Sequence, residues 1–118
     1  MRGRVFVYGT LLPDELRWPV LADVAVDVAE ATAAGRLWDT RRGFPAAVFG
    51  DRGTIPGVVV TVSDDRWDVI LAELDAIEGE GTLYRRLVVE TSVGPATSYE
   101  WLGPTDGMRL LPRGWHDR

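Results

Sequence analysis

The sequence contains no cysteine, no lysine and a single histidine. Without cysteine the chain has no disulfide, no thiolate nucleophile and no Cys-ligated zinc. Without lysine it can form no Schiff base and cannot supply the lysine of a P-loop. The histidine, His116, lies close to the C-terminus, so neither a His-based triad nor a multi-histidine metal site is expected. Carboxylates, tyrosines and the N-terminal amine remain as acid–base groups.

Positive charge and long apolar runs are also scarce. The 13 arginines are outnumbered by 18 acidic residues, which gives a formal net charge of −5. Proteins that bind nucleic acids usually carry a basic balance or a basic stripe, so we expect no nucleic-acid partner. No apolar stretch approaches the roughly 18 residues of a membrane helix, and the opening Met1-Arg2-Gly3-Arg4 precedes only a short apolar run. We therefore expect a cytoplasmic protein without a membrane partner.

With 46% apolar and 26% charged residues, the 118-residue chain has the composition of a globular protein and the length of one domain, residues 1–118. Runs rich in β-branched residues predict strands at 5–8, 24–38 (one bent strand or two), 54–62, 84–93 and 97–102, with a short apolar run at 46–49. Glycine and proline predict turns at 39–45, at 50–53 and at 94–95. A short helix is predicted at 14–18, limited by Pro19.

One long helix is predicted from Asp64 to Glu78. An apolar stripe recurs at helical spacing, made by Trp67, Ile70, Leu71, Leu74 and Ile77. Ser63 is a suitable N-cap, and Gly79 follows the last residue as glycine does after many helices. Since strands and helices do not alternate as in a doubly wound sheet, the order favours an α+β domain with a small mixed sheet or barrel.

Two short segments could carry chemistry. In Tyr8-Gly9-Thr10-Leu11 the glycine allows close approach to a ligand, and successive backbone N–H groups can form an anion-binding concavity; a simple tight turn is the alternative. Glu78 ends the helix, where the helix dipole disfavours negative charge. If it is also partly buried, the pKa of its carboxyl rises toward neutrality, as a proton shuttle requires. A solvent-exposed glutamate at a frayed helix end is the alternative.

A family resemblance joins these segments. Val5-Phe6-Val7-Tyr8-Gly9-Thr10-Leu11, followed by Leu74-Asp75-Ala76-Ile77-Glu78-Gly79 and Tyr84-Arg85-Arg86, resembles the γ-glutamylcyclotransferase-like superfamily, particularly its γ-glutamylamine cyclotransferase branch. Further landmarks follow in the expected order: Gly35-Arg36-Leu37-Trp38-Asp39, Phe44-Pro45-Ala46, Ile55-Pro56-Gly57-Val58, Ser98-Tyr99-Glu100-Trp101 and Gly114-Trp115. The resemblance implies a small mixed β-barrel flanked by helices, with a cavity between the Tyr8–Leu11 loop and Glu78.

The resemblance also implies a reaction. The α-amine of a γ-glutamyl substrate attacks its own side-chain amide, which gives 5-oxoproline and a free amine. Glu78 is the expected general acid–base, the backbones of Gly9, Thr10 and Leu11 would hold the glutamyl α-carboxylate or the reacting carbonyl, and Tyr8 and Tyr84 would shape or hydrogen-bond the pocket. Because the nucleophile belongs to the substrate, no metal and no cofactor are expected.

Two questions stay open at this point. The segment from Glu78 to Tyr84 does not discriminate a γ-glutamylamine from a γ-glutamyl amino acid, and no oligomeric state follows from the sequence. A non-catalytic protein of the same fold that binds an acidic small molecule is the alternative to an enzyme. The presence of Glu78 favours the enzyme, because loss of that carboxylate would have favoured the binding protein.

Overall fold

The computed structural model describes residues 3–118, and for Asp51 it describes the backbone alone. The elements follow in the order β1 (Gly3–Val7), α1 (Pro19–Ala22), β2 (Ala25–Asp39), β3 (Pro45–Val62), η1 (Asp64–Arg66), α2 (Trp67–Glu78), β4 (Tyr84–Thr91), β5 (Gly94–Trp101), β6 (Arg109–Leu110) and η2 (Trp115–Asp117), where η marks a 3-10 helix. Within residues 3–118, neither α-helix has the length and apolar character needed to cross a membrane.

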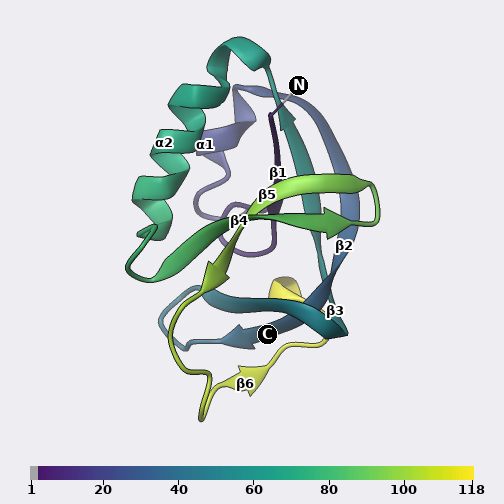
Figure 1. Cartoon of the computed structure of the whole chain (residues 1–118), viewed down its shortest axis with the longest axis vertical. Helices are drawn as coiled ribbons and strands as arrows, with labels where there is room; N and C mark the ends of the chain where they lie inside the picture. Colours follow the sequence, from purple (N-terminus) through teal and green to yellow (C-terminus); the bar gives the residue numbers. More distant parts are fainter. Residues whose placement is uncertain (1–2) are drawn as a thin grey trace.

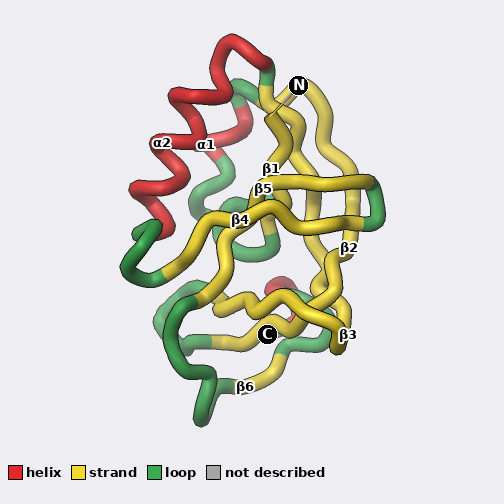
Figure 2. Tube along the Cα trace, viewed as in Figure 1, coloured by secondary structure: helices red, strands yellow, loops and turns green. Residues whose placement is uncertain are grey.

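The strands close into a barrel. Neighbouring strands lie in the order β3, β1, β5, β4, β2, and β2 pairs again with β3, so the ring is complete, while β6 adds to β2 outside it. The pairing of β1 with β5 is parallel and the others are antiparallel. Figure 1 shows β2 and β3 as two long curved ribbons, and Figure 2 shows the helices beside the strands. The small mixed β-barrel flanked by helices is thus confirmed.

β2 is one bent strand, and its bend has a local cause. Opposite Ala34 and Gly35 the partner in β3 steps from Thr54 to Phe49, which leaves residues 50–53 bulged out of the register. Gly35 has a φ of +148°, and a Cβ there would lie 2.5 Å from a carbonyl oxygen of β3. The turn predicted at 50–53 was expected to separate two strands. That prediction is wrong, because β3 continues through these residues. The bulge bends the strand pair without ending it.

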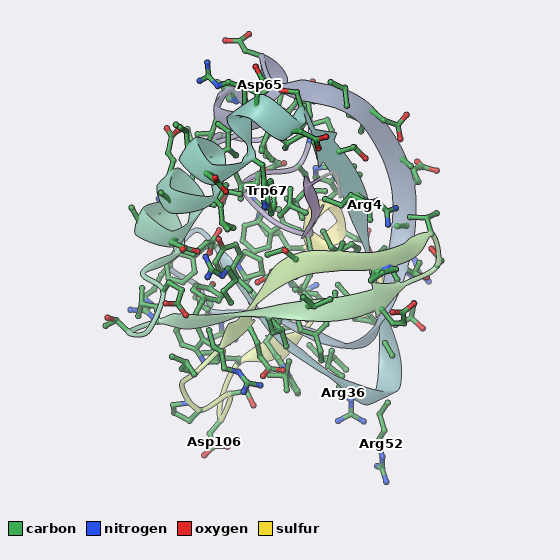
Figure 3. All side chains as sticks on the ribbon, turned by 45° about the horizontal axis from the view of Figure 1, so that its top comes forward. Arg4, Arg36, Arg52, Asp65, Trp67 and Asp106 are labelled. Carbon is green, nitrogen blue, oxygen red and sulfur yellow. The ribbon has the colours of Figure 1, made fainter. Side chains whose placement is uncertain are left out.

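The long predicted helix is confirmed over 64–78, as η1 followed directly by α2. Its apolar stripe faces the barrel: Ile70 and Leu74 are buried, and Trp67 packs over Gly3, where an added Cβ would lie 2.0 Å from the indole. Figure 3 shows Trp67 directed from α2 toward the strands. Among the described residues, Ser63 precedes η1 without a side-chain capping bond. Packing of the stripe therefore holds this helix against β1.

Pro19 and Pro95 have roles in the fold that differ from those predicted: Pro19 begins a helix and Pro95 lies in a strand. The helix predicted at 14–18 is wrong, because α1 begins at Pro19. Proline suits a first helical turn, since its missing N–H would have no acceptor within the helix. Likewise the turn predicted at Gly94-Pro95 lies at Ser92 and Val93, and Pro95 pairs with Glu90 inside β5. Proline is tolerated there because it stands at the beginning of a strand.

Candidate active site

A small cavity of about 110 Å³ opens where β1, α2 and β4 end or begin. Its wall combines the loop after β1, the segment that leads into β3, the C-terminus of α2 and the start of β4. The lining residues are Tyr8, Gly9, Thr10, Arg17, Phe44, Pro45, Ile77, Glu78, Leu83 and Tyr84. The structure thus brings together Tyr8, Gly9, Thr10, Glu78 and Tyr84, which the sequence analysis singled out. Leu11 lies instead in the core, with 5% of its surface exposed.

Glu78 is the acidic group of this cavity. It is the last residue of α2, and Gly79 follows it in the left-handed conformation, with a φ of +64°, so the helix ends abruptly at the cavity wall. Burial raises the pKa of the Glu78 carboxyl to about 7, and the Arg17 guanidinium opposes that rise. A carboxyl whose pKa lies near neutrality can both accept and donate a proton under physiological conditions.

The loop after β1 lines the same cavity as Glu78, through Gly9 and Thr10. The N–H of Leu12 donates to the Gly9 carbonyl at 3.0 Å, and the N–H of Arg17 donates to the Thr10 carbonyl at 2.8 Å. Within residues 3–118, no turn, loop or side-chain hydrogen bond uses the N–H groups of Gly9, Thr10 or Leu11. Successive N–H groups of this kind can bind a carboxylate or a developing oxyanion.

Gly9 has no room for a side chain. A Cβ at this position would lie 2.6 Å from Cγ and 2.7 Å from Cδ of Pro45, another residue of the cavity lining. Glycine therefore lets the loop pack directly against Pro45 in the cavity wall.

Two tyrosines shape the wall, and their hydroxyl protons are already engaged. Tyr8 donates to the backbone carbonyl of Tyr99 at 2.6 Å, and Tyr84 donates to the backbone carbonyl of Pro45. Burial, reinforced by the nearby Glu78 carboxylate, raises the pKa of both phenols well above their ordinary value. Both tyrosines thus stay neutral at physiological pH, and Glu78 is the lining group whose pKa lies near 7.

Arg17 was missed as a cavity residue in the sequence analysis. It lies in the segment between β1 and α1, where no periodicity marks a functional side chain. The chain reverses after Thr10, through Asp14 in a left-handed conformation with a φ of 71°, and this reversal returns Arg17 to the cavity. A non-glycine residue rarely adopts that conformation, so the reversal could not be read from the residue types.

A wider groove of about 690 Å³ lies elsewhere on the barrel, between the Leu12–Asp14 loop, β2, β3 and the C-terminal segment. As described for residues 3–118, its lining includes none of the residues that the sequence analysis assigned to the site. Across the residues that the structure describes, no three His, Cys, Asp or Glu side chains are grouped as a metal ion would require. The smaller cavity, with Glu78 and the Gly9–Thr10 backbone, remains the candidate active site.

Known proteins resemble this chain over almost its whole length. Residues 5–117 match the family described as gamma-glutamyl cyclotransferase, AIG2-like. The chain is 33% identical, over 98% of its own length and 97% of the relative's, to the gamma-glutamylcyclotransferase family protein YtfP of Escherichia coli K12.

Solved structures agree with this assignment. An uncharacterized protein from Pyrococcus horikoshii superposes with a TM-score of 0.74 at 26% identity, covering 98% of this chain and 90% of that one. An AIG2-like protein from Mus musculus superposes with a TM-score of 0.64 at 18% identity, covering 88% of this chain and 78% of that one, which shows the same fold. The match over residues 5–117 and the 33% identity to YtfP establish that the chain belongs to the AIG2-like gamma-glutamyl cyclotransferase family.

Proposed function

We propose that the protein is a γ-glutamyl cyclotransferase that converts a γ-glutamyl amine or amide into 5-oxoproline and a free amine. One observation carries the proposal: a carboxyl with a pKa of about 7 lies in the same small cavity as the Gly9–Thr10 backbone. Family membership supports this class of reaction. The reaction uses the substrate's own amine as nucleophile, so the acid–base group and the oxyanion donors are the groups the protein must supply.

In this mechanism Glu78 moves protons between two nitrogens of the substrate. The ionised carboxylate accepts a proton from the α-ammonium, and the resulting amine attacks the side-chain amide carbon. The new N–C bond closes the five-membered ring and turns the carbonyl into a tetrahedral oxyanion. Glu78 gives its proton to the departing nitrogen as the old C–N bond breaks and the carbonyl re-forms, and the second ammonium proton follows to the released amine. The carboxylate ends in its starting state.

The loop and the cavity supply the remaining help. In this proposal the N–H groups of Gly9 and Thr10, which line the cavity, would bind the substrate's α-carboxylate or the oxyanion that forms at the attacked carbonyl. The small cavity, lined by Gly9, Pro45 and Glu78 among others, would hold the glutamyl chain folded on itself. Well-oriented intramolecular reactions reach effective molarities of about 10⁵–10⁸ M, so this folding contributes a large part of the acceleration.

The test is release of 5-oxoproline from a panel of γ-glutamyl amines, ε-(γ-glutamyl)lysine and γ-glutamyl dipeptides. We expect release by the wild-type protein and a loss of about 100-fold or more in Glu78→Gln. Glu73→Gln is the matched control, because Glu73 is an exposed residue of the same helix outside the cavity lining. Full activity in Glu78→Gln would refute the role of the carboxyl.

Silence of the folded wild-type protein across the whole panel would refute the cyclotransferase activity. In that case a rise in Tm with 5-oxoproline or a γ-glutamyl compound would indicate a binding protein of the same fold.

A further inference from the structure

We infer that Arg17 and Arg42 form an anion-binding rim at the mouth of the cavity, and that this rim selects γ-glutamyl substrates whose leaving amine carries a carboxylate. The inference rests on the proposed cyclotransferase function. Arg17 and Arg42 would bind the amine-bearing group that leaves when the ring closes. The substrate class then narrows to γ-glutamyl derivatives of amino acids and peptides.

The first step is the size of the cavity. A volume of about 110 Å³ is small beside the roughly 300–1,000 Å³ of pockets that enclose whole drug-sized ligands. Glu78 and the Gly9–Thr10 backbone, which act on the glutamyl half, already line this space. The group attached to the departing nitrogen must therefore extend to the mouth.

The second step is the position of Arg17. Most of the lining is buried or half-buried, and Arg17 and Leu83 are its exposed members, so they mark the mouth. The backbone N–H of Arg17 donates to the Thr10 carbonyl at 2.8 Å, and this hydrogen bond holds the Arg17 Cα beside the loop that lines the cavity. The Arg17 charge reaches the interior, because it lowers the pKa of both Glu78 and Tyr84 against the effect of burial.

A second cation, Arg42, lies against the cavity wall. The Arg42 guanidinium carbon lies 5.1 Å from the ring centroid of Phe44, a lining residue, and 5.6 Å from that of Trp101. Stacking on two aromatic rings holds an otherwise exposed side chain in place. The Arg42 charge also lowers the pKa of Tyr84, so it acts on the same cavity as Arg17.

Other arginines of this region form ion pairs with side chains that are described, whereas Arg17 and Arg42 do not. Arg85 pairs with Glu100 at 2.6 Å, and Arg86 pairs with Asp75 at 2.5 Å. Among the side chains that the structure describes, which exclude that of Asp51, no acidic group lies within ion-pairing distance of Arg17 or Arg42. In a chain with a net charge of −5, two unpaired cations at one mouth form a local site for an anion. Arginine suits a carboxylate because it can donate two parallel hydrogen bonds.

The test compares two substrates that differ in one charge: γ-glutamylalanine and its amide, γ-glutamylalaninamide. Release of 5-oxoproline gives kcat/KM for each. We expect the wild-type protein to prefer γ-glutamylalanine by about fivefold or more. Both substrates are assayed at pH 9, above the acid limb, where Glu78 is ionised with or without the Arg17 charge. There the double variant Arg17→Gln/Arg42→Gln should lose activity on γ-glutamylalanine and with it the preference, while activity on the amide changes much less.

Arg36→Gln/Arg52→Gln is the matched control, because it removes the same two charges from exposed side chains outside the cavity lining. Figure 3 shows Arg52 extending away from the body of the protein. The control should keep the wild-type preference. Added salt should weaken that preference in the wild-type protein, since it screens exposed charges.

Each failure has a separate meaning. Equal turnover of the two substrates by the wild-type protein would overturn the rim and leave the cyclotransferase function standing. An equal loss on both substrates in the double variant would also overturn it, because the arginines would then serve the glutamyl half. No 5-oxoproline from either substrate, or from the wider panel, would overturn the proposed function and the rim with it.

Discussion

The hydroxyl of Tyr99 donates to Asp75 Oδ1 at 2.6 Å, one helical turn before Glu78. The other carboxylate oxygen of Asp75 accepts from Arg86 at 2.5 Å, so β4 and β5 both hold the end of α2. The backbone carbonyl of Tyr99 also accepts the Tyr8 hydroxyl. One residue of the barrel therefore connects the helix that carries the carboxyl with the start of the loop that faces it.

Tyr99→Phe should loosen this connection. The substitution removes the bond to Asp75 and keeps the ring in the core, so we expect a loss of about 1–2 kcal/mol in the free energy of unfolding. We also expect a several-fold loss in kcat, because the end of α2 is then held less firmly. Urea unfolding measures the first effect and 5-oxoproline release the second. Unchanged stability would show that the hydrogen bond contributes nothing in solution.

Glu78→Gln should make the protein more stable at pH 8 than the wild type. The pKa of this carboxyl is about 7 when folded and 4.5 ordinarily, so the folded protein binds the extra proton between these values. Wild-type stability therefore falls as pH rises from about 4.5 to 7, and glutamine removes the fall. We expect a difference of about 2 kcal/mol at pH 8, reduced from the full shift because the carboxyl faces an open cavity.

The measurement is chemical unfolding of both proteins at pH 4 and at pH 8. At pH 4 the wild-type carboxyl is protonated in the folded protein, and the two stabilities should nearly coincide. A difference of the same size at both pH values would show that ionisation of Glu78 is not its cause.

The pH profile of kcat/KM should rise through an acid limb near pH 7, because the proposed base is active when it is ionised. Arg17→Gln should move that limb to higher pH, since Arg17 lowers the pKa of Glu78. The neutral-ended γ-glutamylalaninamide is the appropriate substrate, because it separates this effect from carboxylate binding at the mouth. A limb that shifts to lower pH would contradict the electrostatic relationship between the two residues.

Gly9→Ala should reduce activity far more than it reduces stability. The new methyl would press on Pro45, 2.6 Å away, and displace one wall of the cavity. We expect a loss of about tenfold or more in kcat/KM, because small displacements of a reacting geometry are costly. Gly50→Ala is the control, since a Cβ at Gly50 would meet nothing within 4 Å and its φ is not positive. Equal activities for the two variants would show that the narrow approach is unimportant.

The sequence predicted the fold where periodicity and packing agree. The stripe from Trp67 to Ile77 defined the long helix, and Gly79 defined its end. The three misassigned segments, 14–18, 50–53 and 94–95, involve local signals overruled by the barrel. A proline that was expected to limit a helix begins one, and a glycine-bounded turn becomes a bulge because the flanking residues keep their pairing with β2.

The candidate site was predictable only in part, for a geometric reason. Tyr8, Gly9, Glu78 and Tyr84 lie at the ends of elements, and ends can be read from turn and cap residues. Arg17 reaches the cavity through a chain reversal that its neighbours in sequence do not mark.

The parallel pairing of β1 with β5 sets an order for folding. β1 lies between β3 and β5, so the N-terminal strand completes its place only after Gly94–Trp101 has been synthesised and has joined it. Pairings between residues so distant in sequence form late, because a long loop must close first. The Gly9–Thr10 loop follows directly from that strand, so the cavity is complete only once β1 has joined β5. A partly folded chain that lacks this pairing would also lack the finished cavity.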